Sequence, residues 1–300
     1  MSSKFKGTGV AIVTPFHREG SIDFKSFERL IEFQINSGID YIVFLGTTGE
    51  AVTLNSDEKN AIINFAVETI GGRVPIVIGI GGNNTQDIIG KIKKTSFDGI
   101  DAILSVSPYY NKPQQKGIFY HYKNIAGASP VPVIIYNVPG RTASNISAET
   151  TIKIAHEISN VIGIKEASKD LSQCALIIKN KPKDFLVISG DDGVTLPLIA
   201  MGGDGVISVI SNAYPAEYSQ MVKYCLQNNF PQAQRIFYQL VDLIEAVFDD
   251  GSPSGIKALL NIKGMIKNSL RLPLVKVNKG LYNQISILAE KYEETPVLVK

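Results

Sequence analysis

Short runs of apolar, β-branched residues alternate with longer amphipathic stretches over about the first 228 residues. Strands that are buried on both faces of a parallel sheet form near-continuous apolar runs. Each run here ends in Gly, Pro, Ser, Thr or Asp, residues that are common in turns. The eight expected strands are Gly9–Pro15, Tyr41–Thr47, Pro75–Gly81, Ala102–Pro108, Val131–Pro139, Val161–Ser168, Phe185–Asp191 and Gly205–Ser211.

The stretches between these strands carry helical periodicity and helix-starting residues. Apolar residues recur at helical spacing over residues 24–36, directly after Asp23, whose carboxylate can cap the helix. Ser56 is expected to cap the next helix, because acidic residues fill the turn that follows it. Further expected helix starts are Thr85, Ser147 and Asp170.

Eight strand–helix units at this spacing predict a closed (β/α)₈ barrel, with the class α/β. A doubly wound open sheet is the alternative, and the number of strands favours the barrel. After about residue 228 the pattern changes to helices alone, so a barrel over 1–228 and a helical region over 229–300 packed on it are expected. The helices expected in that region are Pro231–Phe248, Pro253–Asn268 and Lys279–Glu293.

Composition narrows the class of protein. Apolar residues make up 44% of the 300 residues and charged residues 19%, which is typical of a soluble globular protein. The net charge of +2 gives no basis for binding nucleic acid. No apolar run is long enough to span a membrane, and the amino terminus lacks the apolar segment of a signal peptide. Cys174 and Cys225 match no metal or redox spacing, so a reducing, cytoplasmic location is expected.

Lys165 stands at the end of the sixth expected strand, behind Val161, Ile162 and Ile164. An apolar environment disfavours the ammonium form, so the amine becomes a usable nucleophile near neutral pH. Such an amine can condense with a carbonyl compound to form a Schiff base. The alternative is a lysine that pairs with Glu166 or extends from the strand end into water.

Other reactive side chains follow the ends of neighbouring strands, where the active sites of (β/α)₈ barrels lie. Tyr136, Thr47 and Tyr110 carry hydroxyls that can relay protons. The backbone N–H groups of Thr47 and Thr48 suit a carboxylate, and Arg141 offers a planar fork for a second one. A lysine, several hydroxyls and an arginine together predict Schiff-base aldol chemistry on an oxo-acid.

The sequence gives no sign of a metal site. His17, His121 and His156 have no metal-binding partners at helical or loop spacing, so they are expected to be structural. Asp191 and Asp192 are adjacent on an extended segment and point in different directions, so they are expected to line the pocket rather than bind a cation.

The motifs GTTGE, SPYYNKP, YNVPGRT, VIGIKEAS, SGDD and GGDGVISV, in this order, resemble the pyruvate-dependent class I aldolases and, within them, the dihydrodipicolinate synthase family. The likeness runs from about Gly7 to the carboxyl terminus. It implies an enzyme that condenses pyruvate with L-aspartate 4-semialdehyde, giving 4-hydroxy-tetrahydrodipicolinate and water on the route to diaminopimelate and lysine. It further implies that no cofactor is needed beyond the covalent lysine Schiff base with pyruvate, and that the protein is a homotetramer built as a dimer of dimers.

The resemblance also implies a role for each matching residue. Lys165 would be the nucleophile toward pyruvate, and Tyr136 the proton donor and acceptor beside it. Thr47 and Tyr110 would complete the proton relay, with Tyr110 or its neighbour Tyr109 near a subunit interface. The implied substrate-binding residues are Thr48, Ile207 and Gly190 for pyruvate and Arg141 for the semialdehyde carboxylate.

Lysine inhibits many members of this family at the dimer interface. In the lysine-sensitive enteric type a Ser and two His residues recur just after GTTGE, where this chain has Ala51, Ser56 and Lys59. A cationic Lys59 would repel a lysine ligand, so weak or absent inhibition is expected. The other matching positions, which could still bind lysine, are Asn83, Asp87 and Tyr109.

Two other functions stay open. N-acetylneuraminate lyase and the 2-keto-3-deoxy sugar-acid aldolases share the pyruvate half of the site, but a neutral sugar aldehyde has no carboxylate for Arg141. A non-catalytic barrel that binds an oxo-acid is disfavoured, because Lys165, Tyr136, Thr47 and Thr48 are all present.

Overall fold

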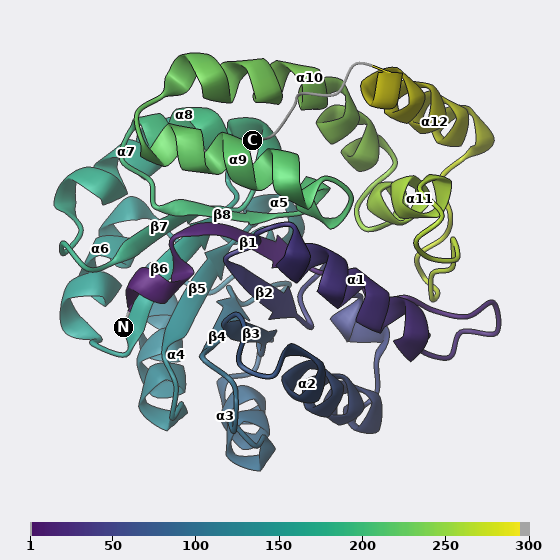
Figure 1. The fold of residues 1–300 in the computed structure, drawn as a ribbon. Coiled ribbons are helices and arrows are strands. Elements are labelled where there is room, and N and C mark those ends of the chain that lie inside the picture. The colour runs from purple at the N-terminus through teal and green to yellow at the C-terminus, as the bar shows by residue number, and fades with distance from the viewer. Residues whose placement is uncertain (1, 295–300) are drawn as a thin grey trace.

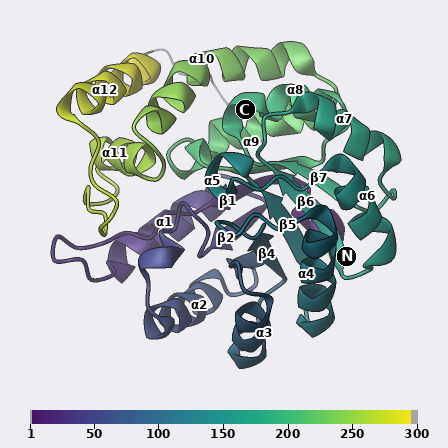
Figure 2. The same cartoon turned by 180° about the vertical axis from the view of Figure 1, so that it is seen from behind.

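A computed structural model describes residues 2–294 and shows a closed barrel of parallel strands with helices around it (Figures 1 and 2). Each strand pairs with the next one in the chain, and β8 pairs with β1 to close the barrel. The predicted fold class is confirmed. Each of the eight predicted strands overlaps an observed strand, and each predicted range runs past the end of that strand into the following loop. The strands are β1 Gly7–Ala11, β2 Tyr41–Phe44, β3 Ile76–Gly79, β4 Ala102–Val106, β5 Val133–Asn137, β6 Val161–Glu166, β7 Leu186–Ser189 and β8 Gly205–Ser208.

A helix follows every strand and covers the outside of the barrel (Figure 1). Among residues 2–294, no helix is long and apolar enough to cross a membrane. The α-helices are α1 Phe24–Asn36, α2 Ser56–Ile70, α3 Thr85–Lys94, α4 Gln115–Ala128, α5 Pro139–Thr142, α6 Ala148–Glu157, α7 Leu171–Asn180, α8 Thr195–Ala200, α9 Pro215–Leu226, α10 Phe230–Asp249, α11 Ser254–Ile262 and α12 Lys279–Glu294. Short 3₁₀ turns are η1 Ser2–Phe5, η2 Ala51–Thr53, η3 Asp192–Val194 and η4 Ile210–Asn212.

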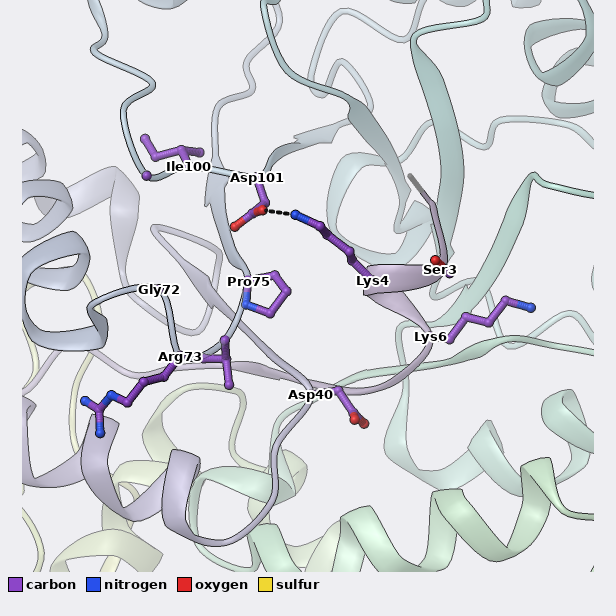
Figure 3. A pocket seen from close by; sticks show the side chains of 11 residues that line it. Ser3, Lys4, Lys6, Asp40, Gly72, Arg73, Pro75, Ile100 and Asp101 are labelled. Atoms are coloured by element: carbon purple, nitrogen blue, oxygen red, sulfur yellow. Dashed lines mark hydrogen bonds and ion pairs between the residues drawn. The ribbon is translucent and has the colours of Figure 1, made fainter.

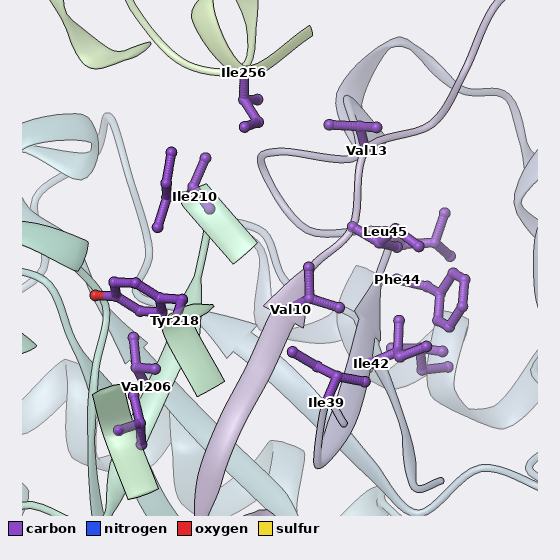
Figure 4. Packing of buried hydrophobic residues seen from close by; sticks show 14 of the residues in the cluster. Val10, Val13, Ile39, Ile42, Phe44, Leu45, Val206, Ile210, Tyr218 and Ile256 are labelled. Carbon is purple, nitrogen blue, oxygen red and sulfur yellow. The ribbon is translucent and has the colours of Figure 1, made fainter. Parts of the chain in front are cut away.

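The strands divide their side chains between two buried layers. Alternate residues of a strand point to opposite faces, so Ile134 and Tyr136 of β5 enter the barrel interior while Val133 and Ile135 pack under the helices. Figure 4 shows part of the outer layer, in which Ile256 of α11 belongs to the same buried apolar cluster as residues of the strands. At the carboxyl ends of the strands, polar side chains replace the apolar side chains of the interior layer.

The helix starts differ from expectation in two places. Asp23, Ser147 and Asp170 cap their helices through side-chain oxygens, as predicted. The prediction for Ser56 is wrong: Asn55 is the cap and forms a reciprocal capping box with Glu58. Thr85 is the first residue of α3, but the Asn84 side chain caps that helix. In both places an Asn one residue earlier accepts the first free N–H groups.

The three expected carboxyl-terminal helices are present as α10, α11 and α12. α11 is shorter than predicted and ends at Ile262, because Gly264 takes a left-handed φ of 70° just beyond it. α10 packs on α9, and the Arg29 guanidinium of α1 donates to the Met265 carbonyl at 2.8 Å. The domain boundary at residue 228 stays a prediction, and residues 295–300 of the predicted helical region lie outside the described part.

Candidate active site

Lys165 and Tyr136 lie side by side at the carboxyl end of the barrel. They are register partners on β6 and β5, so both side chains point into the interior. The Lys165 Nζ is 4.5 Å from the centroid of the Tyr136 ring. Lys165 is 5% exposed and Tyr136 8%, so both are almost withdrawn from water.

Burial gives the Lys165 amine the reactivity of a nucleophile. Removal from water disfavours the ammonium form and lowers the pKa of Lys165 to about 8. The carboxylates of Asp192 and Asp191 oppose this shift, and the Arg141 guanidinium adds to it. Near neutral pH the side chain is therefore a mixture of ammonium and free amine, and the free amine can attack a carbonyl.

The Tyr136 hydroxyl is held in its protonated form. Burial raises the pKa of Tyr136 to about 12, and the positive charge of Arg141 and the hydroxyl of Thr47 offset part of that rise. A phenol that keeps its proton next to an amine can donate it and take it back as charge develops. The Thr47 side chain thus lies near the Tyr136 hydroxyl.

A polar network that the sequence did not reveal supports these two residues from the other side of the sheet. Asn137 and Glu166, the next residues along β5 and β6, point away from the interior. The Asn137 amide donates to both Glu166 oxygens at 3.0 Å, and the Gln173 amide donates to Glu166 at 3.0 Å. This network ties β5 to β6 and to α7, and so fixes the spacing of Tyr136 and Lys165.

Two further predicted residues lie in the same interior. A Cβ atom at Gly190 would lie 3.1 Å from Lys165 Cε and 2.7 Å from the Ala167 Cβ, so Gly190 gives the lysine the room that it occupies. Ile207 of β8 is buried in the interior apolar layer. Gly190 therefore borders Lys165, and Ile207 belongs to the interior layer of the same barrel.

The segment Gly46–Glu50 enters the 3₁₀ turn η2, and α2 begins only at Ser56. Thr48 is buried and Thr47 is exposed at the rim. The Glu50 N–H donates to the Thr47 carbonyl at 3.0 Å, which closes a tight turn around the two threonines. Arg141, in α5, is also at the surface and donates to the Ser252 carbonyl at 3.2 Å.

Tyr110 lies apart from this cluster within the chain. It is 88% exposed and has a left-handed φ of 73°. Among residues 2–294, the structure gives no hydrogen bond that joins Tyr110 to Tyr136 or Thr47. Its neighbour Tyr109 accepts a hydrogen bond from the Asn83 amide at 3.2 Å.

The positions that match the family's lysine site follow three successive strands: Ala51, Ser56 and Lys59 follow β2, Asn83 and Asp87 follow β3, and Tyr109 follows β4. The Asn83 side-chain amide donates a hydrogen bond to the Tyr109 carbonyl, and Asp87 is exposed on α3. Ala51 is the first residue of the turn η2, and Ser56 is the first residue of α2. Burial and the nearby charge of Lys91 lower the pKa of Lys59, so a second cationic group lies close to Lys59.

The described chain offers no cluster of three or more His, Cys, Asp or Glu residues that could hold a metal ion. One Asp192 oxygen accepts the Val209 and Ile210 N–H groups at 2.9 Å, and the residue is buried. His121 is buried as well and bonds to the Thr85 hydroxyl at 2.8 Å, and burial lowers its pKa to about 4. These contacts are those of structural side chains.

A hollow opens on the rim of the barrel opposite to Lys165 (Figure 3). Its residues Lys6, Asp40, Pro75 and Asp101 come just before β1, β2, β3 and β4, at the amino ends of the strands. The Asp101 carboxylate already accepts the Lys4 ammonium at 2.9 Å. Catalytic residues of such barrels lie at the carboxyl ends, so this hollow is separate from the Lys165 site.

Known proteins similar to this chain cover nearly all of it. The sequence profile of the dihydrodipicolinate synthetase family matches residues 4–291. The 4-hydroxy-tetrahydrodipicolinate synthase of Flavobacterium psychrophilum is 50% identical over 287 residues, which are 96% of this chain and 98% of that protein. The enzyme of the same name from Parabacteroides distasonis is 51% identical over 280 residues, 93% of this chain and 94% of that one.

Solved structures agree with the sequence relatives. Dihydrodipicolinate synthase from Aquifex aeolicus superposes with a TM-score of 0.93 at 38% identity, covering 96% of this chain and 98% of that one. A structure described as the first monomeric dihydrodipicolinate synthase variant has a TM-score of 0.94 at 37% identity and covers 99% of both chains. The resemblance inferred from the motifs is confirmed, and the chain belongs to the dihydrodipicolinate synthetase family.

Proposed function

We propose that this protein is a lyase of the class I aldolase type that condenses pyruvate with L-aspartate 4-semialdehyde. The product is 4-hydroxy-tetrahydrodipicolinate, with release of one water, at the first committed step toward diaminopimelate and lysine. The observation that carries the proposal is the buried Lys165 amine, with its pKa lowered to about 8, beside the protonated Tyr136 hydroxyl. Relatives about half identical over nearly the full length carry the matching name.

The reaction begins at Lys165. Its free amine adds to the C2 carbonyl of pyruvate, and loss of water gives a protonated imine. The imine withdraws electrons from the methyl group, which loses a proton to give an enamine. The enamine carbon attacks the aldehyde of the semialdehyde, and the aldehyde oxygen takes up a proton. The amino group of the second substrate then attacks the imine carbon and releases Lys165.

Tyr136 and Thr47 move the protons that these steps require. The Tyr136 phenol supplies a proton to the departing water and recovers one as the methyl group is deprotonated. It then supplies a proton to the aldehyde oxygen and recovers one from the amino group of the second substrate, as that group displaces Lys165. The exposed Tyr110 is proposed to complete the relay in a neighbouring subunit. Its exposure and its place beside Tyr109 support an assembly such as the expected tetramer, although a monomeric variant exists among the relatives.

The remaining residues bind the two carboxylates. Thr48 is proposed to hold the pyruvate carboxylate through its N–H and hydroxyl, against the apolar wall formed by Ile207 and the space left by Gly190. Arg141 is proposed to bind the semialdehyde carboxylate with its planar fork. The covalent lysine supplies the electron withdrawal, so the proposed reaction requires no metal or dissociable cofactor. A cytoplasmic location is the expected one.

Substrate comparison tests the proposal. Purified protein is supplied with pyruvate and either L-aspartate 4-semialdehyde or N-acetylmannosamine, and pyruvate consumption is followed. Consumption with the semialdehyde alone is expected, because only that aldehyde brings a carboxylate to Arg141. Consumption with the sugar alone would retain the Schiff base and refute the proposed second substrate.

A further inference from the structure

A buried ion pair joins the carboxyl-terminal helices to the turn that carries Thr47 and Thr48. Glu50, the last residue of that turn, and Lys257 of α11 both have side chains that are 0% exposed. The Lys257 ammonium donates to one Glu50 oxygen and, at 3.0 Å, to the Ser269 carbonyl. The second Glu50 oxygen accepts the Arg271 backbone N–H at 3.1 Å.

Arg271 extends the same attachment to the rest of the loop between β2 and α2. Its guanidinium donates to the Thr53 carbonyl at 3.0 Å and forms a two-point ion pair with Glu58 in the first turn of α2. Lys257 and Arg271 also lie over the Phe16 ring, with 4.2 Å and 4.5 Å to its centroid. The loop is therefore held at three points by residues more than two hundred positions away.

The attachment reaches the two threonines through the backbone. Glu50 has a left-handed φ of 54°, a conformation that is costly for a residue with a side chain and persists only when its surroundings hold it. In that conformation its N–H donates to the Thr47 carbonyl at 3.0 Å. Movement of Glu50 would thus turn the peptide groups of Thr47 and Thr48.

We propose that Glu50 and Lys257 are positioning residues for pyruvate binding. The buried pair holds the Thr47–Thr48 peptide in the orientation that receives the pyruvate carboxylate, so α11 and the segment 269–271 form part of the working active site. This inference rests on the proposed function and adds to it residues that touch neither substrate. It also gives the helical region a role besides covering the barrel.

A purely structural role for the pair makes a different prediction. A buried charge left without its partner strongly destabilises a protein, whereas replacing both partners by apolar residues of similar volume is often neutral. If the pair only joins the helical region to the barrel, the double variant Glu50→Met/Lys257→Met recovers both stability and pyruvate affinity. If the pair orients the turn, the double variant recovers stability alone.

The experiment measures the pyruvate concentration that gives half-maximal borohydride trapping on the protein, together with the melting temperature. Trapping needs no second substrate, so it reports on the pyruvate half of the site alone. In Glu50→Gln and in Glu50→Met/Lys257→Met, the half-maximal concentration is expected to rise on the order of 10- to 100-fold, the effect of a misplaced binding group. The melting temperature of the double variant is expected to lie above that of Lys257→Met.

A matched control removes a different ion pair that is mostly buried. Lys181→Met breaks the pair with Asp204 at 3.6 Å on the opposite rim, and its half-maximal pyruvate concentration is expected to stay within about twofold of the original protein. Unchanged half-maximal pyruvate in the double variant would overturn the positioning role while leaving the proposed function intact. A failure of the unaltered protein to trap pyruvate would instead refute the proposed function, and this inference with it.

Discussion

Lys165 and Tyr136 occupy the same rung of the barrel, as register partners on β6 and β5, with the amine 4.5 Å from the centre of the phenol ring. One burial has opposite effects on the two groups: it lowers the pKa of Lys165 to about 8 and raises that of Tyr136 to about 12. The Lys165 ammonium therefore loses its proton easily, whereas the Tyr136 phenol beside it keeps its proton. This difference is what Schiff-base formation near neutral pH requires.

Tyr136→Phe tests the proton shuttle. The substitution keeps the ring against Lys165 but removes the hydroxyl, so kcat is expected to fall about 10²- to 10⁴-fold. Slow borohydride trapping of pyruvate should persist, since the Lys165 amine remains. A kcat within about threefold of the original would show that the proton travels by another route.

The reaction with pyruvate should depend on pH through Lys165. Below pH 8 most of the amine is protonated, so the rate of imine formation is expected to rise as pH increases and to level off above about 8. Burial also lowers the pKa of Lys257 to about 8, so the same profile is measured in Glu50→Met/Lys257→Met. In this double variant the midpoint of the pH profile should stay near pH 8. Loss of the midpoint would show that the titrating group is Lys257 rather than Lys165.

Gly190→Ala should crowd the nucleophile. The added Cβ would lie 3.1 Å from Lys165 Cε and from the Glu166 carbonyl, and 2.7 Å from the Ala167 Cβ. Imine formation is expected to slow at least tenfold, and stability to fall by about 1–3 kcal/mol, as for other overpacked sites. Gly127→Ala in α4 is the control, because a Cβ there meets no atom within 4 Å. Equal rates in both variants would exclude a role for the space at Gly190.

Arg141→Gln tests whether Arg141 binds the semialdehyde and not pyruvate. Loss of a charged hydrogen bond to the semialdehyde carboxylate costs about 1.5–3 kcal/mol, or roughly 10- to 100-fold in kcat/KM for that substrate. Half-maximal pyruvate in the trapping assay should change by less than about twofold. Arg141→Lys keeps the charge but loses the fork, so it should be intermediate. A selective loss of pyruvate binding would contradict the assignment.

Lysine should inhibit weakly or not at all. Lys59, with the charge of Lys91 nearby, would repel a lysine molecule that approaches the positions matching the family's lysine site, which are Ala51, Ser56, Asn83, Asp87 and Tyr109. A lysine titration at saturating substrate is expected to leave the rate unchanged up to millimolar concentrations. Strong inhibition in that range would show that Asn83 and Tyr109 suffice for binding.

The sequence predicted the barrel because its signals are local. Eight apolar runs with turn residues at their ends mark buried parallel strands, and the residues just beyond them gather at one rim once the barrel closes. Helix starts were predicted less well where two capping residues adjoin, as at Asn55 and Ser56, since either side chain can accept the first N–H groups.

The residues that hold the active-site side chains in position could not be predicted from the sequence. Glu50 and Lys257 are 207 positions apart, and nothing near either residue identifies the other as its partner. Asn137 and Glu166 directly follow Tyr136 and Lys165, yet their hydrogen bonds depend on the register of β5 against β6. Which strand-end side chains come into contact depends on how the strands pair once the barrel has closed.

Peptide mapping of the reduced pyruvate adduct tests the central claim most directly. Lys165 and Lys257 are both buried lysines with a pKa near 8, but Lys257 is held by Glu50 outside the barrel interior, whereas Lys165 faces Tyr136. After borohydride treatment with pyruvate, the adduct should map to the peptide with Lys165 alone and be absent from Lys165→Ala. An adduct on Lys257, or one that survives Lys165→Ala, would contradict the mechanism.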